Sequence, residues 1–333
     1  MAGAGAFGLA CAVRLARAGA EVVVFDAAAP TANASGVAAG MLAPVFESAL
    51  DEAARPHFAL LAAARELWPA FAQETGIELD RRGALAVGDA DRLEALAAKV
   101  AVFDTAAARL DMDQAAALAP GLSGAYAGGL FTAEDWRIDA AAAIAALRRA
   151  AEAQGVVFRP EPLRDLGDAD RLVIATGAAQ DLSHLAPALA LLAPIKGHIL
   201  RLPGAAYQGV VVRGPAAYAA PAGGGLAVGA TMEAGAADCA IDPARAAALQ
   251  AAGEAMFPAL AGADVRPLAA VRAATPDGLP LVGPTDDRRV LLAVGARRNG
   301  WLLAPMVSRI IAAYVQDADP GARAEVLRPA RFG

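Results

Sequence analysis

The stretch Gly3-Ala4-Gly5-Ala6-Phe7-Gly8 has the spacing G-x-G-x-x-G. Residues 9–18 after it have helical composition, and residues 21–25 are typical of a buried strand that ends on Asp26. In such a turn the three glycines allow a sharp change of direction, close approach to a pyrophosphate, and tight packing of helix on strand. The helix start attracts phosphate, and the acid after the strand accepts hydrogen bonds from a ribose. The order of these parts predicts a dinucleotide-binding site.

The strand that normally precedes the first glycine is missing from this pattern. Only Met1 and Ala2 stand before Gly3, and a strand usually needs at least three residues. We therefore hypothesise that the native protein starts several residues upstream, which a mass measurement of the native protein would test.

Composition excludes several classes of protein. The chain has 333 residues, enough for two domains. Alanine supplies much of the 57% hydrophobic content, and the longest apolar run, residues 185–195, contains two prolines and is too short to span a bilayer. The net charge of −6 without a basic run argues against nucleic acid and anionic membranes. Cys11 and Cys239 have no metal spacing, so we expect no metal site and a reducing, cytoplasmic location.

Two kinds of pattern alternate along the chain. Helix and strand patterns typical of a nucleotide-binding sheet occur at the start, middle and end, and glycine-separated short strands from residue 194 predict an antiparallel sheet. Within the first kind, residues 47–74 have one apolar helical stripe, and Asp139 is placed to cap a helix at residues 140–154. We therefore predict an α/β fold with a Rossmann-like domain formed by residues 1–79, 139–190 and 264–333. Residues 80–138 and 191–263 would form an inserted antiparallel-sheet domain.

Few polar residues stand where chemistry could occur, and the residues alone leave their roles open. Arg272 either pairs with a structural carboxylate, which is slightly favoured because buried arginines are usually paired, or binds an anionic ligand. Residues 297–300 form either a solvated turn or a set of backbone donors before a helix. Residues 34–44 are either alanine-rich filler or a backbone that runs close to a flat ring. Tyr218 stands in a strand, where a tyrosine more often packs at the edge of the core than contacts a ligand. His57, His184 and His198 have no metal spacing and are interpreted as non-catalytic.

Taken together, these motifs resemble the D-amino-acid-oxidase-like, FAD-dependent flavoproteins, and within them the glycine oxidases of thiamine biosynthesis. The resemblance implies a two-domain architecture like that of D-amino-acid oxidase and glutathione reductase, and it extends over almost the whole chain. Its carriers are residues 3–9, 38–44, 129–131, 175–178, 194–197, 228–232, 272–280 and 298–305.

The resemblance implies FAD as the cofactor. The residues that it assigns to FAD are Gly3, Gly5, Ala6, Phe7, Gly8, Asp26, Ala27, Ser35, Ala39, Gly40, Met41, Leu163, Thr176, Gly177, Arg298, Asn299, Gly300, Trp301 and Leu302. Ala6 and Phe7 would lie at the pyrophosphate, Asp26 at the adenosine ribose, and Leu163 at the adenine. Residues 39–41 would run beside the flavin, and residues 298–302 would close over its pyrimidine edge.

The resemblance also implies the substrate site and the reaction. Arg272 matches the arginine that forks onto the substrate carboxylate, which replaces the structural interpretation above. Tyr218 would hydrogen-bond the same carboxylate, Met232 would line the pocket, and Arg298 completes the catalytic set. A small amino acid such as glycine would lose a hydride to the flavin, giving a 2-oxo acid and ammonia, and dioxygen would yield hydrogen peroxide. Relatives also imply a homo-oligomer.

Two alternatives remain open: a dehydrogenase of D-amino acids or N-methyl amino acids with another electron acceptor, and a non-catalytic scaffold without flavin. The chain also departs from the family pattern. Ala296 and Arg297 stand where a histidine and an aromatic residue are usual, and His198 replaces a Gln or Glu. Residues 159–171 are too few for the small β-meander often found there.

Overall fold

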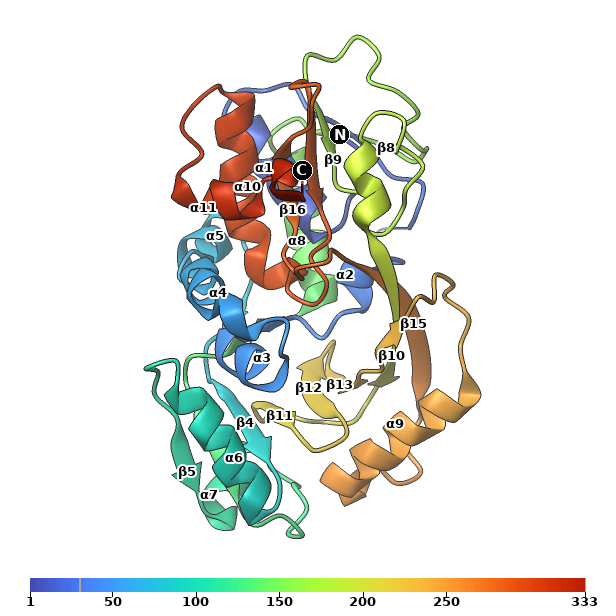
Figure 1. Cartoon of the computed structure of the whole chain (residues 1–333). Coiled ribbons are helices and arrows are strands. Elements are labelled where there is room, and N and C mark those ends of the chain that lie inside the picture. Colours follow the sequence, from blue (N-terminus) through green and yellow to red (C-terminus); the bar gives the residue numbers. More distant parts are fainter. Residues whose placement is uncertain (30, 333) are drawn as a thin grey trace.

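Two β-sheets organise the computed structural model, which describes residues 1–29 and 31–332. Figure 1 shows one sheet in the upper half, among the helices near both chain ends, and the other in the lower half. Segments from the start, middle and end of the chain share the upper half, so the chain passes between the two halves more than once. This interleaving agrees with the predicted α/β class. The domain boundaries themselves stay a prediction.

The upper sheet contains the predicted nucleotide-binding strands. Its elements are β1 (Val23–Phe25), β8 (Val157–Arg159), β9 (Leu172–Ile174), β16 (Leu281–Pro284) and β17 (Val290–Val294). β1 pairs with β8 in parallel, and β9 lies beside β17. Ala2 forms parallel bridges to both Phe25 and Ile174, and its backbone N–H donates to the Val173 carbonyl at 2.9 Å. Residues 1–3 thus make bridges rather than a strand, yet they join the two halves of the sheet at its centre.

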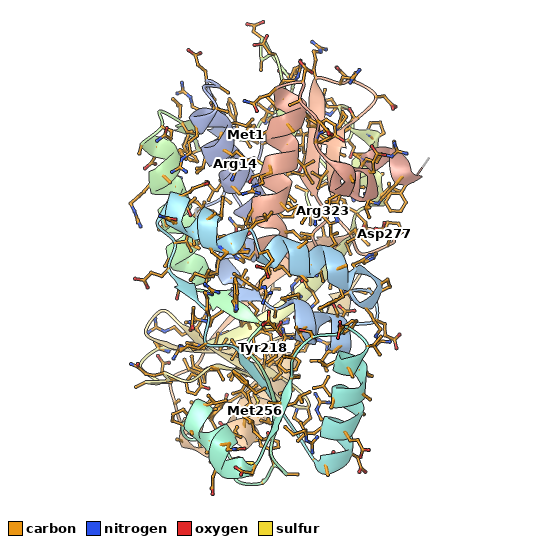
Figure 2. All side chains as sticks on the ribbon, turned by 90° about the vertical axis from the view of Figure 1, so that its left-hand side faces the viewer. Met1, Arg14, Tyr218, Met256, Asp277 and Arg323 are labelled. Atoms are coloured by element: carbon orange, nitrogen blue, oxygen red, sulfur yellow. The ribbon has the colours of Figure 1, made fainter. Side chains whose placement is uncertain are left out.

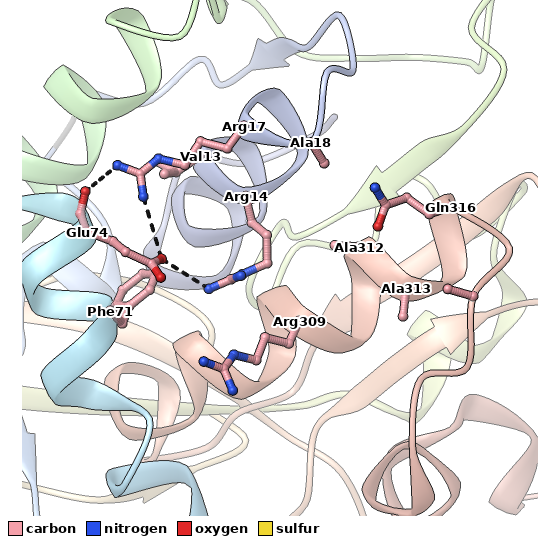
Figure 3. A pocket seen from close by; sticks show the side chains of 11 residues that line it. Val13, Arg14, Arg17, Ala18, Phe71, Glu74, Arg309, Ala312, Ala313 and Gln316 are labelled. Carbon is pink, nitrogen blue, oxygen red and sulfur yellow. Dashed lines mark hydrogen bonds and ion pairs between the residues drawn. The ribbon is translucent and has the colours of Figure 1, made fainter.

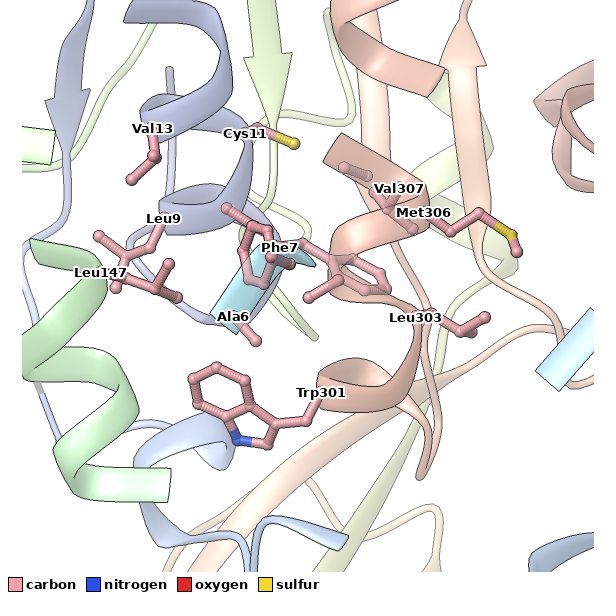
Figure 4. Close-up of a cluster of buried hydrophobic side chains, with 14 of the residues drawn as sticks. Ala6, Phe7, Leu9, Cys11, Val13, Leu147, Trp301, Leu303, Met306 and Val307 are labelled. Atoms are coloured by element: carbon pink, nitrogen blue, oxygen red, sulfur yellow. The ribbon is translucent and has the colours of Figure 1, made fainter. Parts of the chain in front are cut away.

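Three helices form the core over this sheet. α1 (Ala6–Arg17) packs against α8 (Ala140–Glu152) and α10 (Gly300–Val315). Figure 4 shows the apolar contact, in which the α1 side chains face those of the other two helices; the buried members include Ala6, Phe7, Leu9, Cys11, Val13, Leu147, Trp301, Leu303, Met306 and Val307. Each large side chain buried here contributes about 1.5–3 kcal/mol. This packing fixes the beginnings of α1 and α10 relative to each other.

The lower sheet is built on one long strand, β10 (Ala193–Leu202), which pairs with β13 (Gly225–Gly229), β14 (Glu233–Ala234) and β15 (Arg266–Ala274). The remaining strands are β4 (Ala84–Val87), β5 (Ala108–Leu110), β6 (Gly129–Thr132), β11 (Val211–Arg213) and β12 (Tyr218–Ala222). All pairs are antiparallel except β4 with β11. The outer helices of this half are α6 (Ala90–Ala101), α7 (Met112–Leu118) and α9 (Pro243–Met256).

The predicted single helix at residues 47–74 is wrong. The structure divides this region into α3 (Pro44–Leu50), α4 (Phe58–Arg65) and α5 (Trp68–Thr75), with a short 3-10 turn at Arg55–His57. Pro56 and Pro69 explain the breaks, because proline lacks the N–H that a helix interior needs and is tolerated in a first turn. The predicted helix after Asp139 is confirmed, and the Asp139 side chain accepts a hydrogen bond from the Ala142 N–H at 2.9 Å.

Smaller elements complete the fold. They are α2 (Ala34–Val37), α11 (Ala322–Leu327), the three-stranded sheet of β2 (Met41–Leu42), β7 (Trp136–Ile138) and β3 (Leu79–Asp80), and 3-10 turns at Pro187–Leu191, Pro258–Leu260 and Pro329–Phe332. The helices that the structure describes include none with the length and apolarity to cross a membrane. Among the same residues, no group of three or more His, Cys, Asp or Glu side chains could hold a metal ion.

Candidate active site

The beginning of α1 is shaped by glycines that have no room for a side chain. A Cβ atom on Gly8 would lie well under 3.0 Å from the Gly3 carbonyl oxygen, and one on Gly3 would meet the Ala175 carbonyl as closely. Both obstacles are backbone atoms, which cannot move aside. Helix and strand therefore pack as closely as the motif predicts, and the first turn of α1 carries no acidic residue. Its backbone N–H groups and helix dipole make it suited to phosphate.

Asp26 is held beside this turn. One oxygen of its carboxylate accepts from the Ala4 N–H at 2.7 Å, and the other accepts from the Ala28 N–H at 2.9 Å. Ala27 follows in the same loop and is exposed. The structure thus places Asp26 at the end of β1 next to the glycine turn. Its hydrogen bond to ribose stays a prediction.

The stretch assigned to the flavin is anchored from two sides. The Ser35 hydroxyl accepts from the Ala6 N–H at 3.0 Å, and the Ser35 carbonyl accepts from the Trp301 indole N–H at 3.0 Å. From the lower sheet, Arg201 donates to the carbonyls of Val37 and Ala38 at 2.8 and 2.9 Å. These contacts bring residues 35–41 together with the starts of α1 and α10. Sequence reasoning missed Arg201, whose signal was a charged residue between the apolar neighbours Leu200 and Leu202.

Tyr218 and Arg272 lie in the lower sheet, each against a glycine of a paired strand. Figure 2 shows Tyr218 below Met1 and above Met256, on the side of the molecule nearer to Met256. A Cβ on Gly229, its partner across β12 and β13, would be 2.5 Å from the Tyr218 hydroxyl. A Cβ on Gly197 would likewise overlap the Arg272 guanidinium. The glycines leave the space that these two polar groups occupy.

Arg272 contacts neutral groups only. Its Nη1 donates to the Thr231 carbonyl at 3.3 Å and lies 3.5 Å from the Met232 sulfur. No Asp or Glu in the described part of the chain lies within ion-pair distance of it, so the structural ion pair that the residues alone favoured is not formed. Burial lowers the pKa of the Arg272 guanidinium and Tyr218 opposes that shift. Burial also raises the pKa of Tyr218, although the nearby arginines act against it. The Tyr218 hydroxyl therefore keeps its proton.

A buried carboxylate that sequence reasoning missed lies next to Arg298. Glu47, on α3, is 2.7 Å from Nη2 of Arg213 and 3.1 Å from Nε of Arg298. Burial alone would raise its pKa, but Arg298 and Arg213 outweigh it and lower the pKa to about 2. Directly after α3, Asp51 pairs with Arg297 and lies 3.9 Å from Nη1 of Arg298. Helix α3 thereby fixes the loop that precedes α10.

Asp135 holds the first turn of α3 in place. Its two oxygens accept from the backbone N–H groups of Val45 and Phe46 at 2.8 and 2.9 Å. The carboxyl is fully buried, and burial raises its pKa to about 6, against the opposing effect of Arg213 and the two hydrogen bonds. Sequence gave no signal for Asp135, because its partners lie about 90 residues away in the chain.

The remaining candidates lie at the edges of this site. Thr176 and Gly177 follow β9, where the Thr176 hydroxyl donates to the Ala179 carbonyl at 3.3 Å, and Leu163 packs against the apolar cluster at the same end of the sheet. His198 is fully buried, and its backbone N–H donates to the Thr231 hydroxyl at 2.8 Å. Its Nε2 accepts from the Asp242 N–H at 2.9 Å, so Nδ1 carries the proton toward Glu233, 2.9 Å away. His198 therefore supports the loop beside Arg272.

Comparisons with known proteins identify relatives that are oxidoreductases. A Rhizobium etli protein named as the thiamine biosynthesis oxidoreductase ThiO is 32% identical, and the match covers 93% of this chain and 94% of that protein. The bifunctional protein ThiO/ThiG of Synechocystis sp. is 30% identical over 68% of this chain, but the match spans only 38% of that longer relative. Among solved structures, glycine oxidase from Geobacillus kaustophilus has a TM-score of 0.83 and 26% identity, with 96% of this chain and 94% of that chain covered.

The family match covers nearly the whole chain, from residue 2 to residue 314, and its description is FAD-dependent oxidoreductase. That span contains the glycine turn, the segment beside Trp301 and the Tyr218–Arg272 pair. FAD is therefore the cofactor, and the chain belongs to the family of FAD-dependent oxidoreductases.

Proposed function

We propose that this chain oxidises glycine or another small amino acid at Cα and produces a 2-oxo acid, ammonia and hydrogen peroxide. The observation that carries the proposal is Arg272, a largely buried guanidinium with no carboxylate partner in the described structure, next to a protonated Tyr218. A buried cation of this kind needs an anion of matching shape, and a substrate carboxylate supplies one. The relative named glycine oxidase, 27% identical over 94% of this chain, supports the same substrate class.

The residues present fit FAD. The glycine turn leaves the backbone of α1 open toward a phosphate, and the Ser35 and Trp301 contacts hold the adjoining stretch against the start of α10. Ala6, Phe7 and Asp26 would hold the dinucleotide, and residues 39–41 and 298–302 would hold the ring. When bound, FAD would supply the group that accepts the hydride and afterwards gives its two electrons to dioxygen.

The chain itself contributes position and charge. Arg272 would bind the carboxylate through both guanidinium nitrogens while the Tyr218 hydroxyl donates a third hydrogen bond, which fixes Cα in one orientation. The oxidation would use the substrate amine in its neutral form, whose lone pair assists the loss of hydride from Cα. No side chain needs to remove a proton from Cα.

An anaerobic titration tests this function. The visible spectrum of the purified holoenzyme is recorded before and after addition of glycine, sarcosine or D-alanine, and peroxide is then measured in air. We expect the oxidised-flavin bands to bleach with at least one of these and peroxide to form. A flavin that bleaches without peroxide would identify a dehydrogenase with another acceptor. Flavin that none of the three substrates reduces would contradict the proposal, and absence of flavin would favour the scaffold alternative.

We also propose that the protein acts in thiamine biosynthesis, in the cytoplasm and as a homo-oligomer. The name of the Rhizobium etli relative supports the pathway. Both cysteines are free thiols, one buried and one exposed, which fits a reducing compartment. Growth without thiamine after gene deletion would contradict the pathway role, and light scattering of the holoenzyme measures the oligomeric state.

A further inference from the structure

Four guanidinium groups gather around the proposed carboxylate site. Arg213 belongs to β11, Arg272 to β15, and Arg297 with Arg298 to the loop before α10. We name these four residues the arginine cluster. Arg213 stands opposite Tyr218 in the pairing of β11 with β12. Arg298 and Arg297 also lower the pKa of Arg272, and the pKa of Tyr218 responds to Arg272, Arg298 and Arg213. Without carboxylate partners, these groups would present more than one positive charge to an anion that enters this region.

Carboxylates of the chain pair with three members of the cluster and leave the fourth. Glu47 binds Arg213 and Arg298, and Asp51 binds Arg297. Glu47 lies on α3, and Asp51 directly follows the helix, where its backbone N–H donates to the Glu47 carbonyl at 2.9 Å. Asp135, whose two amide hydrogen bonds fix the first turn of α3, adds a third carboxylate that acts on Arg213 through space.

The charges balance when the three carboxylates are ionised. Within the cluster, Arg213, Arg297 and Arg298 are then offset by Glu47, Asp51 and Asp135, and Arg272 keeps an unpaired positive charge. Arg201, which also acts on Tyr218, donates to the Val37 and Ala38 carbonyls instead. The pairs are largely buried, with Glu47 5% and Arg213 4% exposed. Loss of one partner from such a pair leaves an uncompensated charge, which an anion from solution can offset.

We propose that Glu47 and Asp51 restrict the site to substrates with a single carboxylate, because they occupy the guanidinium groups that would otherwise bind a second one. The inference rests on the proposed function, since it takes Arg272 as the group that binds the first carboxylate. A second carboxylate would meet Glu47 and Asp51 instead of a free cation, and would lose its hydration without compensation. The substrate class is therefore amino acids with a neutral or absent side chain, to the exclusion of acidic ones.

The test compares two unreactive anions on the holoenzyme. Acetate carries one carboxylate and malonate two, and the dissociation constant of each is measured from the change that it causes in the flavin absorbance. In the wild-type protein we expect malonate to bind no tighter than acetate. In Glu47→Gln we expect the affinity for malonate, relative to that for acetate, to rise by about tenfold or more, because Arg213 and Arg298 lose their carboxylate partner. Glu47→Asp, which restores the charge, should return the ratio toward the wild-type value.

A matched control uses the same substitution elsewhere. Glu74 also joins two arginines, Arg14 at 3.4 Å and Arg17 at 3.5 Å, and Figure 3 shows them at a groove of about 350 Å³ that Arg309 and Gln316 also line. The residues that line this groove include none of the proposed substrate or flavin groups. Glu74→Gln should leave the malonate-to-acetate ratio unchanged.

Each outcome separates this inference from the proposed function. Wild-type protein that binds malonate at least tenfold tighter than acetate would overturn the inference directly. The inference would also be overturned if Glu47→Gln had the same malonate-to-acetate affinity ratio as the wild type while acetate binding still depended on Arg272. If Glu47→Gln does not retain flavin, Asp51→Asn replaces it, with a smaller shift in the same direction expected because Asp51 pairs mainly with Arg297. If Arg272→Ala leaves acetate binding unchanged, the proposed function itself fails.

Discussion

The glycine turn at the start of α1 and the arginine cluster use opposite means to hold an anion. The turn consists of backbone packed on backbone, with Gly8 against the Gly3 carbonyl and no charged side chain in its first helical turn. The cluster consists of long side chains, and the carboxylates of Glu47 and Asp51 decide which guanidinium stays unpaired. A site made of backbone is fixed as soon as the fold forms. A site made of balanced charges depends on single substitutions and on pH.

The largest loss of stability is expected from a substitution in the glycine turn. Gly8→Val places its side chain against a backbone carbonyl, so helix and strand must separate, with a loss of more than about 4 kcal/mol in the free energy of unfolding. Flavin content and chemical denaturation measure it. Gly124→Ala, where a Cβ meets nothing within 4 Å, should change neither. Retained flavin and stability in Gly8→Val would show that this region tolerates side chains.

The next effect concerns the unpaired guanidinium. Arg272→Ala should lower kcat/KM for the amino-acid substrate by about a thousandfold, because a buried charge-assisted hydrogen bond is lost, while flavin stays bound. Steady-state kinetics and the flavin-to-protein ratio measure the two parts separately. Arg266→Ala, at the exposed start of the same strand, serves as the control. Wild-type kinetics in Arg272→Ala would contradict the proposed role of Arg272 in binding the substrate carboxylate.

The cluster, unlike the turn, should also respond to pH. Burial raises the pKa of Asp135 to about 6, so the folded state binds this proton more tightly than the unfolded chain does. The stabilisation that this gives is fully present below about pH 4 and is lost as the pH rises through 6. The free energy of unfolding of Asp135→Asn, relative to wild type, should therefore increase by about 2 kcal/mol between pH 4 and pH 7. Denaturant titrations across this range measure the difference, and a constant difference would contradict the assignment.

The smallest effect sharpens the contrast between the two regions. Gly197→Ala, like Gly8→Val, introduces an overlap, but the obstructing atoms are the movable end of Arg272. We expect little loss of stability and an increase in KM of about tenfold, with kcat less affected, since the guanidinium shifts but survives. If stability fell as in Gly8→Val, the neighbouring strands would be as rigid as the turn.

The same contrast explains what could be predicted from the sequence. Gly3, Gly8 and Asp26 lie within one short stretch, and the backbone geometry that they impose is local. The Asp139 cap is local too. Glu47 and Arg298, however, are separated by 251 residues, and Val45 and Asp135 by 90.

No spacing rule connects residues so far apart, so the carboxylates of Glu47 and Asp51 and the role of Arg201 emerged only from the folded chain. Arg272 and Tyr218 were found through family resemblance, because an arginine or tyrosine in a strand has no distinctive local signal. The long helix predicted for residues 47–74 failed for a local reason, since Pro56 and Pro69 begin new turns within an apolar stripe that continues across the breaks.

The position of Trp301 gives the protein an internal optical reporter. All three tryptophans, Trp68, Trp136 and Trp301, are buried, which favours blue-shifted fluorescence. The Trp301 indole donates to Ser35 between the starts of α1 and α10, where the isoalloxazine is proposed to bind. Energy transfer to an adjacent flavin would quench its emission, so loss of cofactor should appear as brighter fluorescence before the chain unfolds.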